Sequence, residues 1–215
     1  MKLNKKHFEK INLKTKKILL GSYISRTWED DPIHLVFSLS RYKFVSKMLE
    51  GKKKVLEIGA GDGFQSRVVS QYVKSLDLCD IEQSNISQFK QLLFNKNKYF
   101  IHNFINKKYN KKYDAIYCLD VIEHIHKKNF YKFLKNIYSS LNSNGVLIIG
   151  TPSLESQKYA SKNLKKIHIN CFEKKKLKIF VEKIFKNCFV FGMNDEVLHT
   201  GFDKMCHYIF AICTK

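Results

Sequence analysis

A strand followed at once by three glycines is the feature that most limits what this chain can fold into. The run from Val55 to Gly63 reads Val-Leu-Glu-Ile-Gly-Ala-Gly-Asp-Gly. Its first four residues predict a strand, and the glycines allow a tight turn that brings a ligand against the main chain. Such a turn before a helix is typical of nucleotide-binding sites, because N–H groups at a helix start point outward. We therefore expect a nucleotide or a related molecule to bind here.

Two kinds of ligand compete for this turn. A dinucleotide site has the pattern Gly-x-Gly-x-x-Gly, whereas this chain has Phe64 at the place of the third glycine. Glu57 and Asp62 would put two negative charges beside a pyrophosphate, which like-charge repulsion opposes. S-adenosylmethionine carries no phosphate, and its ammonium and sulfonium groups suit carboxylates. The charges favour S-adenosylmethionine, and a glycine turn without a ligand is the alternative.

Strands and helices alternate after the turn. Strands are predicted at 76–79, 99–101 and 146–150, with a further strand from Tyr113 to just before Asp120. Helices are expected at 64–73, 127–141 and about 173–185, and the strands 188–191 and 207–213 end the chain. This order predicts an α/β fold in which helices cover both faces of a parallel sheet.

Polar residues follow these strands in the order of a known family. Asp80 ends the second strand, where a carboxylate can accept hydrogen bonds from ribose hydroxyls. Asn103 follows the third strand, and the segment from Asp120 to His124 follows the fourth. Residues 53–152 resemble the class I S-adenosylmethionine-dependent methyltransferases, whose first motif has the form (Asp/Glu)-x-Gly-x-Gly-x-Gly. The resemblance implies a doubly wound, seven-stranded, mostly parallel sheet that ends in a C-terminal antiparallel hairpin.

The resemblance also implies which residues hold the cofactor, S-adenosylmethionine, and its product, S-adenosylhomocysteine. They are Glu57, Gly59, Ala60, Gly61, Gly63, Phe64, Asp80, Ile81, Asn103, Phe104, Leu119, Asp120 and His124. Asn103 departs from the family pattern, in which an aspartate accepts a hydrogen bond from the adenine amine. An amide oxygen also accepts, and a turn-capping asparagine is the alternative.

Length and composition predict one methyltransferase domain over residues 1–215. Within it we expect an N-terminal helical cap or lid (1–50), a cofactor-binding half (51–152) and a substrate-side half (153–215). No apolar run approaches the roughly 18 residues of a membrane-spanning helix. The six cysteines lack Cys-x-x-Cys spacing, which predicts a reducing cytoplasm with neither disulfides nor a zinc site. No cluster of Asp, Glu and Asn predicts a magnesium site, so no metal is expected.

The net charge of +20 comes from lysine, since 36 lysines accompany only three arginines. The lysines are dispersed, whereas nucleic-acid surfaces commonly use arginine for its planar, bidentate geometry. We therefore predict a solvated lysine surface, with a surface that binds polyanions as the alternative. The Pro-Pro motif of adenine-amine methylation and the Pro-Cys pair of cytosine methylation are both missing from the sequence.

The acceptor side of the site is predicted to lie outside the glycine turn. His168 and His199 are the candidate bases because histidine titrates near neutral pH, and a structural role is the alternative for each. Asp195 or Glu196 is expected to orient the base or to pair with an ammonium group of the substrate. The expected acceptor is an oxygen or nitrogen of a small molecule, such as a sugar, a surface-polysaccharide precursor or another metabolite. Methylation of RNA or protein through the lysine surface, and a non-catalytic cofactor-binding module, are the alternatives. An oxidoreductase is the least favoured reading, and the oligomeric state is open.

Overall fold

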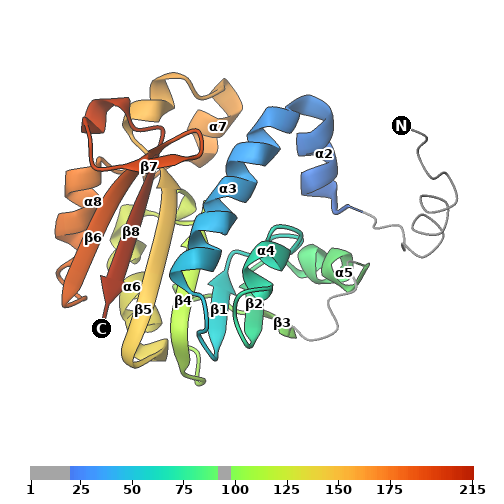
Figure 1. Cartoon of the computed structure of the whole chain (residues 1–215), viewed down its shortest axis with the longest axis vertical. Coiled ribbons are helices and arrows are strands. Elements are labelled where there is room, and N and C mark those ends of the chain that lie inside the picture. Colours follow the sequence, from blue (N-terminus) through green and yellow to red (C-terminus); the bar gives the residue numbers. More distant parts are fainter. Residues whose placement is uncertain (1–19, 92–97) are drawn as a thin grey trace, which may run out of the picture.

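The computed structural model describes residues 20–91 and 98–215. Within these residues the chain forms one eight-stranded sheet in the order β3-β2-β1-β4-β5-β8-β6-β7 (Figure 1). The strands are β1 (Val55–Ile58), β2 (Leu76–Asp80), β3 (Lys98–Ile101), β4 (Tyr113–Leu119), β5 (Leu141–Pro152), β6 (Asn187–Asn194), β7 (Val197–His199) and β8 (Tyr208–Thr214). β1 to β5 pair in parallel, whereas β8 is antiparallel to both of its neighbours, β5 and β6. The predicted α/β fold is confirmed, but the sheet has eight strands and not seven.

Helices connect the parallel strands and cover the sheet. They are α2 (Ser22–Asp30), α3 (Pro32–Met48), α4 (Ser66–Ser70), α5 (Gln83–Gln91), α6 (Lys127–Ser140), α7 (Lys162–Ile167) and α8 (Lys174–Val181), with short 3₁₀ turns η1 (Ile122–His124), η2 (Glu155–Lys158) and η3 (Asp203–Met205). The predicted N-terminal segment, 1–50, is described from residue 20 onward and consists of α2 and α3. None of the described helices is both long and apolar enough to cross a membrane.

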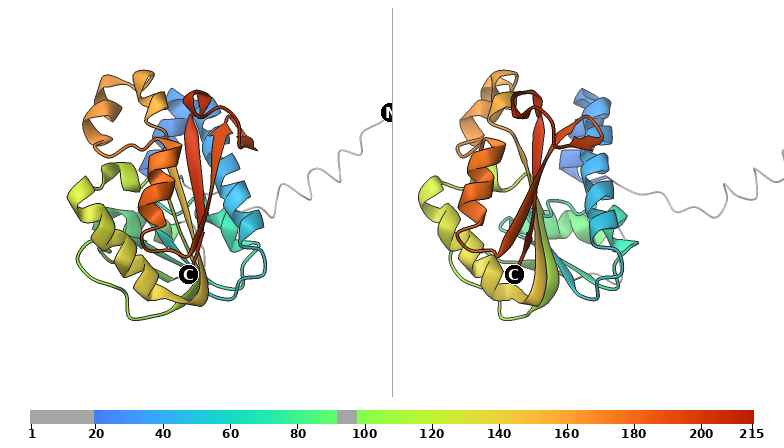
Figure 2. Two further views of the ribbon diagram at one scale, coloured as in Figure 1. Left: turned by 90° about the vertical axis from the view of Figure 1, so that its left-hand side faces the viewer. Right: turned by 60° about the vertical axis from the view of Figure 1, so that its left-hand side comes forward.

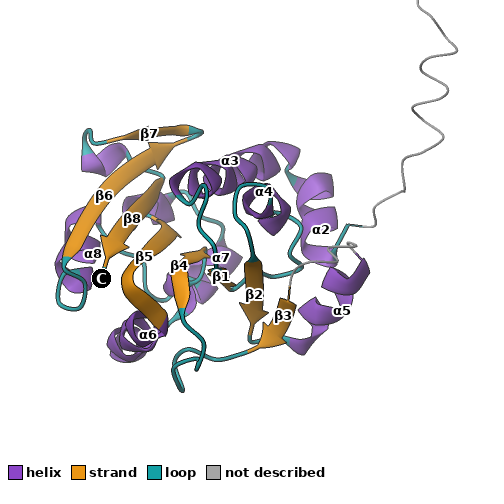
Figure 3. Ribbon diagram, turned by 60° about the horizontal axis from the view of Figure 1, so that its bottom comes forward, coloured by secondary structure: helices purple, strands orange, loops and turns teal. Residues whose placement is uncertain are grey.

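Both faces of the sheet are buried because successive strand residues point to opposite sides. Ile116 and Leu147 pack in one core cluster with residues of α6 and α8. Their sequence neighbours Tyr117 and Ile148 pack in a second cluster with residues of α3 and α4. Figure 2 shows α6 and α8 on one side of the sheet and α3 on the other, and Figure 3 shows the same layers from below. The continuous apolar runs of the central strands follow from this double burial.

Two predicted boundaries are wrong. The first helix after the turn is only Ser66–Ser70, because the preceding residues form the turn itself. Residues 144–145, predicted as a turn, lie inside β5, which starts directly after α6. A register shift between Tyr113 and Ala115 accommodates this early start on the neighbouring strand.

The eighth strand, β7, lies between the two predicted C-terminal strands, 188–191 and 207–213, where no strand was predicted. β6 continues to Asn194, which pairs with Val197 of β7. The two residues between them form the turn, with Asp195 in the left-handed region at φ 50°. Two-residue turns of this kind match the twist of paired strands, so the polar run forms a hairpin.

A buried carboxylate joins β1 to its neighbours. Glu57 has no solvent exposure, and its two oxygens accept hydrogen bonds from the hydroxyls of Tyr42 on α3 (2.8 Å) and Tyr117 on β4 (2.6 Å). Burial raises the pKa of Glu57, and the tyrosine hydroxyls oppose that rise. Since an unpaired buried charge is costly, this trio fixes α3 against the sheet.

Removal of one hydroxyl tests this trio. Tyr117→Phe keeps the buried ring but leaves Glu57 Oε2 without its donor, so we expect the free energy of unfolding to fall by about 1–3 kcal/mol near pH 8. A carboxyl group whose folded pKa is raised favours folding while protonated and loses that contribution as the pH rises through its folded pKa. The loss should therefore shrink near pH 5, as measured by urea unfolding at both pH values. Tyr131→Phe, at an exposed tyrosine, is the control, and equal losses in the two variants would contradict the trio.

Candidate active site

A cavity of about 490 Å³ lies at the carboxyl ends of β1 and β4. One wall is the glycine turn, residues 59–62, and a second wall is formed by α2 and α3. The residues after β4 and the segment from η2 to His168 form the remaining walls. Open α/β sheets bind ligands at this edge, where neighbouring parallel strands end together.

The turn after β1 depends on glycine. Its φ angles are 76° at Gly59, 55° at Gly61 and 77° at Gly63, a region that other residues rarely adopt. Gly59 is constrained a second time, because a Cβ atom there would collide with the Cγ2 methyl group of Val121. The turn can therefore lie directly against the residues that follow β4.

The main-chain N–H groups of the turn are used inside the protein. Those of Gly59 and Ala60 donate to the carbonyl oxygen of Cys79 at 2.9 and 3.1 Å. That of Gly61 donates to Asp80 Oδ2 at 2.9 Å. Gly59, Ala60 and Gly61 therefore offer no free amide donor of the kind that a phosphate group requires.

Acidic groups border the cavity instead. Asp62, Asp120 and Glu123 all line it. Asp62 also adjoins the start of α2, where a Cβ atom on Gly21 would overlap its carboxylate. Burial raises the pKa of Asp62, while the N–H groups of Phe64 and of residue 24 lower it. Paired amides and clustered carboxylates suit a positively charged ligand and disfavour a pyrophosphate.

The structure divides the predicted cofactor residues into two groups. Those that line the cavity are Gly59, Ala60, Gly61, Leu119, Asp120 and His124. Those absent from its described lining are Glu57, Gly63, Phe64, Asp80, Ile81, Asn103 and Phe104. For both groups, contact with the cofactor stays a prediction.

Several members of the second group are engaged in the fold. The Glu57 carboxylate points into the core because its strand position faces α3, and Phe104 is 2% exposed. Asn103 Oδ1 accepts a hydrogen bond from the N–H group of Ile105 at 2.8 Å, which is the turn-capping alternative. Asp80 accepts from two main-chain N–H groups, one of them in the glycine turn.

Asp120 is held by an arginine that the sequence analysis did not select. Its carboxylate accepts hydrogen bonds from Arg41 Nη1 at 3.1 and 3.3 Å, and its backbone is left-handed at φ 55°. Arg41 lies on α3 and stacks over the ring of Tyr208 on β8, 4.0 Å from its centroid. One feature of the sequence could have drawn attention to Arg41, namely that arginine is scarce in a chain so rich in lysine.

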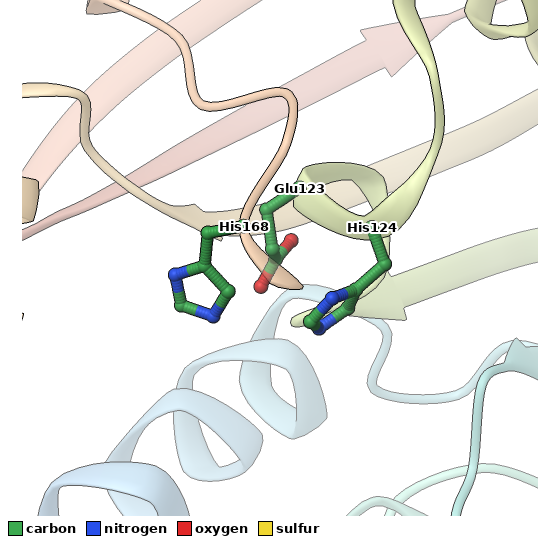
Figure 4. A group of neighbouring side chains, drawn as sticks. All are labelled: Glu123, His124 and His168. Atoms are coloured by element: carbon green, nitrogen blue, oxygen red, sulfur yellow. The ribbon is translucent and has the colours of Figure 1, made fainter. Parts of the chain in front are cut away.

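Three potential metal ligands meet on the wall after β4. Figure 4 shows the side chains of Glu123 and His124, from η1, close to that of His168, which follows α7. One ligand atom of each lies within 4.8 Å of the others. The N–H group of Asn170 donates to the Glu123 carbonyl oxygen at 3.0 Å and holds the two segments together. No metal was predicted from the sequence. The cluster forms only when the segment after α7 lies against η1, and the sequence pattern does not show that contact.

Glu123 has one oxygen available for a ligand. The residue is fully buried, and its Oε2 accepts a hydrogen bond from Thr151 Oγ1 at 3.0 Å. Its Oε1 has no hydrogen-bond partner among the described residues. Burial raises the pKa of Glu123 to about 8, and the charge of Asp120 adds to the rise. A buried carboxylate with one unpartnered oxygen is an environment that a metal ion stabilises.

Each of the two histidine rings is held through its Nδ1 atom. His124 Nδ1 lies 3.1 Å from the carbonyl oxygen of Ile167, and His168 Nδ1 lies 3.0 Å from Gln157 Oε1. Because both partners are acceptors, we assign the proton to Nδ1, which leaves a lone pair on Nε2. Burial and the neighbouring His124 lower the pKa of His168, which favours its neutral form. Metal-bound histidines are commonly oriented by such a bond to the far nitrogen.

The other two predicted catalytic residues are not at the cavity. Asp195 is in the β6–β7 turn, and His199, on β7, has its Nε2 3.3 Å from Asn194 Oδ1. Neither belongs to the described lining, whereas His168 does. The cavity lining also contains residues that were not predicted as site residues, from α2, α3, η1, η2 and β8 and from the residue before β8. They are Tyr23, His34, Ser38, Arg41, Glu123, Gln157, His207 and Tyr208.

Comparison with known proteins decides the family. The profile of the family described as a methyltransferase domain matches residues 34–190, which is more than half of the chain. The chain belongs to this methyltransferase domain family. The methyltransferases of this family depend on S-adenosylmethionine, and similar folds have been solved with this cofactor or its product, which confirms the predicted cofactor.

Curated relatives align with part of this chain. The ubiquinone biosynthesis O-methyltransferase of Rickettsia canadensis is 29% identical over 128 residues, which cover 56% of this chain and 51% of the relative. Nodulation protein S of Azorhizobium caulinodans is 31% identical over 100 residues, or 46% of this chain and 48% of the relative. The chain therefore spans about half the length of the curated relatives it matches.

Solved structures share the fold at low identity. The small RNA methyltransferase HEN1 aligns with a TM-score of 0.70 at 16% identity, over 83% of this chain and 25% of that chain. The N-methyltransferase NodS of Bradyrhizobium japonicum, in complex with S-adenosylhomocysteine, aligns with a TM-score of 0.62 at 13% identity, over 87% and 90% of the two chains. At these identities the likeness establishes the fold.

A pair of glycines with the same backbone conformation tests the turn. Gly51 and Gly59 have φ angles of 78° and 76°, but a Cβ atom meets nothing within 4 Å at Gly51 and collides with Val121 at Gly59. Gly51→Ala should lower the free energy of unfolding by about 1–2 kcal/mol and leave binding of S-adenosylhomocysteine unchanged. Gly59→Ala should in addition weaken that binding at least tenfold, measured by calorimetry. Equal binding by the two variants would contradict the role of the turn.

Proposed function

We propose that this protein transfers the methyl group of S-adenosylmethionine to an oxygen or nitrogen atom of a small molecule. The acceptor class is a sugar, a surface-polysaccharide precursor or another metabolite. The observation that carries the proposal is a single cavity that joins the glycine turn to the Glu123–His124–His168 cluster. One similar protein is an O-methyltransferase and another is an N-methyltransferase, which supports both oxygen and nitrogen as the acceptor atom.

The chemistry asked of the cavity is positioning and proton removal. An acceptor oxygen or nitrogen attacks the methyl carbon, the carbon–sulfur bond breaks, and its electron pair stays on sulfur, which yields S-adenosylhomocysteine. The acceptor loses one proton. Since the sulfonium is already activated, the protein has to align the two reacting atoms and assist this proton loss.

The cluster fits a divalent cation. One carboxylate oxygen of Glu123 and one ring nitrogen each of His124 and His168 are the three ligand atoms. Oε1 is the Glu123 oxygen without a hydrogen-bond partner among the described residues, and the Nδ1 contacts leave Nε2 as the ligating nitrogen of each ring. One carboxylate oxygen with two imidazole nitrogens is a donor set that Zn²⁺, Mn²⁺, Fe²⁺ or Co²⁺ accepts. A cation bound there would lower the pKa of an acceptor hydroxyl. Gln157 and the Ile167 carbonyl oxygen keep the two imidazoles in the ligating tautomer.

Substitution of single ligands tests the cluster. His168→Ala and Glu123→Gln should each weaken Mn²⁺ or Zn²⁺ binding at least tenfold and lower methyl transfer by about 10²–10⁴. Binding of S-adenosylhomocysteine should stay within threefold of the unchanged protein. His126→Ala, an exposed histidine on the same segment, is the control. His199→Ala in the same assay tests the second predicted base, for which the structure places no atom at the cavity.

Removal of bound metal gives an independent test. Treatment with a chelator should abolish methyl transfer, and added Mn²⁺ or Zn²⁺ should restore it. Full activity after removal of the metal, or turnover unchanged in both His168→Ala and Glu123→Gln, would contradict the proposed role of the cluster. That result would not contradict methyl transfer itself, which depends on the cofactor site.

The acceptor class is tested by labelled methyl transfer to an extract of the source cell. Separation into small molecules, glycans, RNA and protein should place the label in the first two fractions. Label in RNA or protein would contradict the proposed acceptor, and tight cofactor binding with no labelled product would indicate a non-catalytic module. We place the reaction in the cytoplasm, since all six cysteines are free thiols.

A further inference from the structure

Two buried cysteines face each other in the C-terminal part of the sheet, where β6 and β8 run side by side (Figure 1). Cys188 on β6 and Cys213 on β8 are direct partners in the antiparallel register of these strands. Their Sγ atoms are 3.6 Å apart, and the Cys213 thiol donates to the Cys188 sulfur. Neither residue belongs to the described lining of the cavity, so the cofactor site does not explain this contact.

The strand geometry suits a covalent bond between the two sulfurs. Cα atoms of paired residues on antiparallel strands are roughly 4.5–5.5 Å apart. A disulfide spans Cα separations of roughly 4.4–6.8 Å, so the pairing of the strands already meets this requirement. Rotation of the two side chains has to close the remaining gap between the sulfurs. Packing as two small hydrophobic groups is the alternative role, and it requires no contact between the sulfur atoms.

The contact makes the two thiols unequal. The hydrogen bond from Cys213 lowers the pKa of Cys188, and the charge of Lys178 acts in the same direction, while burial and Glu182 oppose it. The same contact, together with burial, raises the pKa of Cys213, which therefore keeps its proton. Since the thiolate is the nucleophile in sulfur chemistry, Cys188 is the residue of the pair that reacts first.

Cys188 is also the more accessible of the two. β7 pairs with β6 at residues 192–194, so the start of β6 lies on the edge of the described sheet. Cys188 keeps 4% of its surface exposed at this edge, whereas Cys213 is fully buried between β5 and β6. A small, uncharged oxidant can reach the Cys188 sulfur there, and the Cys213 sulfur is then its nearest thiol partner.

We propose that hydrogen peroxide converts Cys188 and Cys213 into a reversible disulfide that cross-links β6 to β8. The Cys188 sulfur attacks one peroxide oxygen, the O–O bond breaks, and a sulfenic acid forms while the other oxygen leaves as water with the proton of Cys188. The Cys213 sulfur then attacks the sulfenic sulfur, the S–O bond breaks, and a second water leaves with the proton of Cys213. Two thiols lose two electrons in total, and one peroxide becomes two waters.

The cross-link holds the end of the chain in the sheet. Cys188 and Cys213 enclose β7 and η3, and the bond closes this segment into a loop. A closed loop restricts the unfolded chain and thereby stabilises the folded one. β8 also carries Tyr208 to the cavity, so the bond supports that wall. In a reducing cytoplasm the disulfide lasts only while an oxidant is present, and a dithiol reductant reverses it.

Peroxide treatment followed by peptide mapping tests the cross-link. The reduced full-length protein is treated with hydrogen peroxide, its remaining thiols are alkylated, and its non-reduced tryptic peptides are analysed by tandem mass spectrometry. The unchanged protein should lose two hydrogen atoms and two alkylation sites, and dithiothreitol should restore both. Its melting temperature should rise by about 5–10 °C on oxidation.

Matched variants assign the bond. Cys206→Ser removes the other cysteine of the tryptic peptide that contains Cys213, and it should still form the cross-link. Cys171→Ser, at the one cysteine that is not fully buried, should also form it. Cys213→Ser should form no cross-link and show no rise in melting temperature with peroxide.

The other outcomes overturn the inference. They are six alkylated thiols after treatment, a bond through Cys171 or Cys206, and sulfinic acid at Cys188 without a cross-link. If Cys213→Ser does not fold, fragment masses of the linked peptide in the unchanged protein still distinguish Cys213 from Cys206. A melting temperature that does not rise once the bond has formed overturns the role of the cross-link in holding β8.

Discussion

The parallel pairing of β1 with β4 is the constraint on which the site depends. Ile58 and Cys118 are the last paired residues, so the chain leaves both strands side by side. Gly59 then turns against Val121 with no room for a Cβ atom, which brings the glycine turn into contact with the segment from Asp120 to His124. The glycine turn and the segment from Asp120 to His124 lie next to each other because β1 and β4 end at the same level of the sheet.

Burial organises the charges around this junction. Glu57 is deep in the sheet and satisfied by two tyrosines, so it supports α3 and does not face the cavity. Glu123 is equally buried but keeps one oxygen free, and Asp120 is shared with a stacked arginine. Three carboxylates thus have three roles, which differ in the number of hydrogen-bond donors that surround each of them. Unsatisfied groups lie at the cavity, where a ligand can complete them.

Local patterns were informative where the chemistry is contiguous in the sequence. The left-handed glycines and the strand before them are adjacent, so the turn could be predicted from one short run. The polar residues that follow the later strands added the family resemblance that implied the cofactor. The prediction was wrong in the segment 192–202, where a strand depends on pairing with a neighbouring strand. There Val197–His199 pairs with the edge of β6 and forms a hairpin.

The sequence by itself determined the fold class and the glycine turn, because strand periodicity and glycine conformations are properties of neighbouring residues. The cofactor was implied by the resemblance of residues 53–152 to a known family. Tertiary structure alone decided which polar groups share the cavity. His168 reaches Glu123 because the segment after α7 is bonded to η1, and Arg41 reaches Asp120 because α3 packs across β1 and β4. His199, equally plausible from its residue type, is turned toward Asn194 by the β6–β7 hairpin. Contacts between distant segments depend on how helices pack on the sheet, and a single sequence does not state that packing.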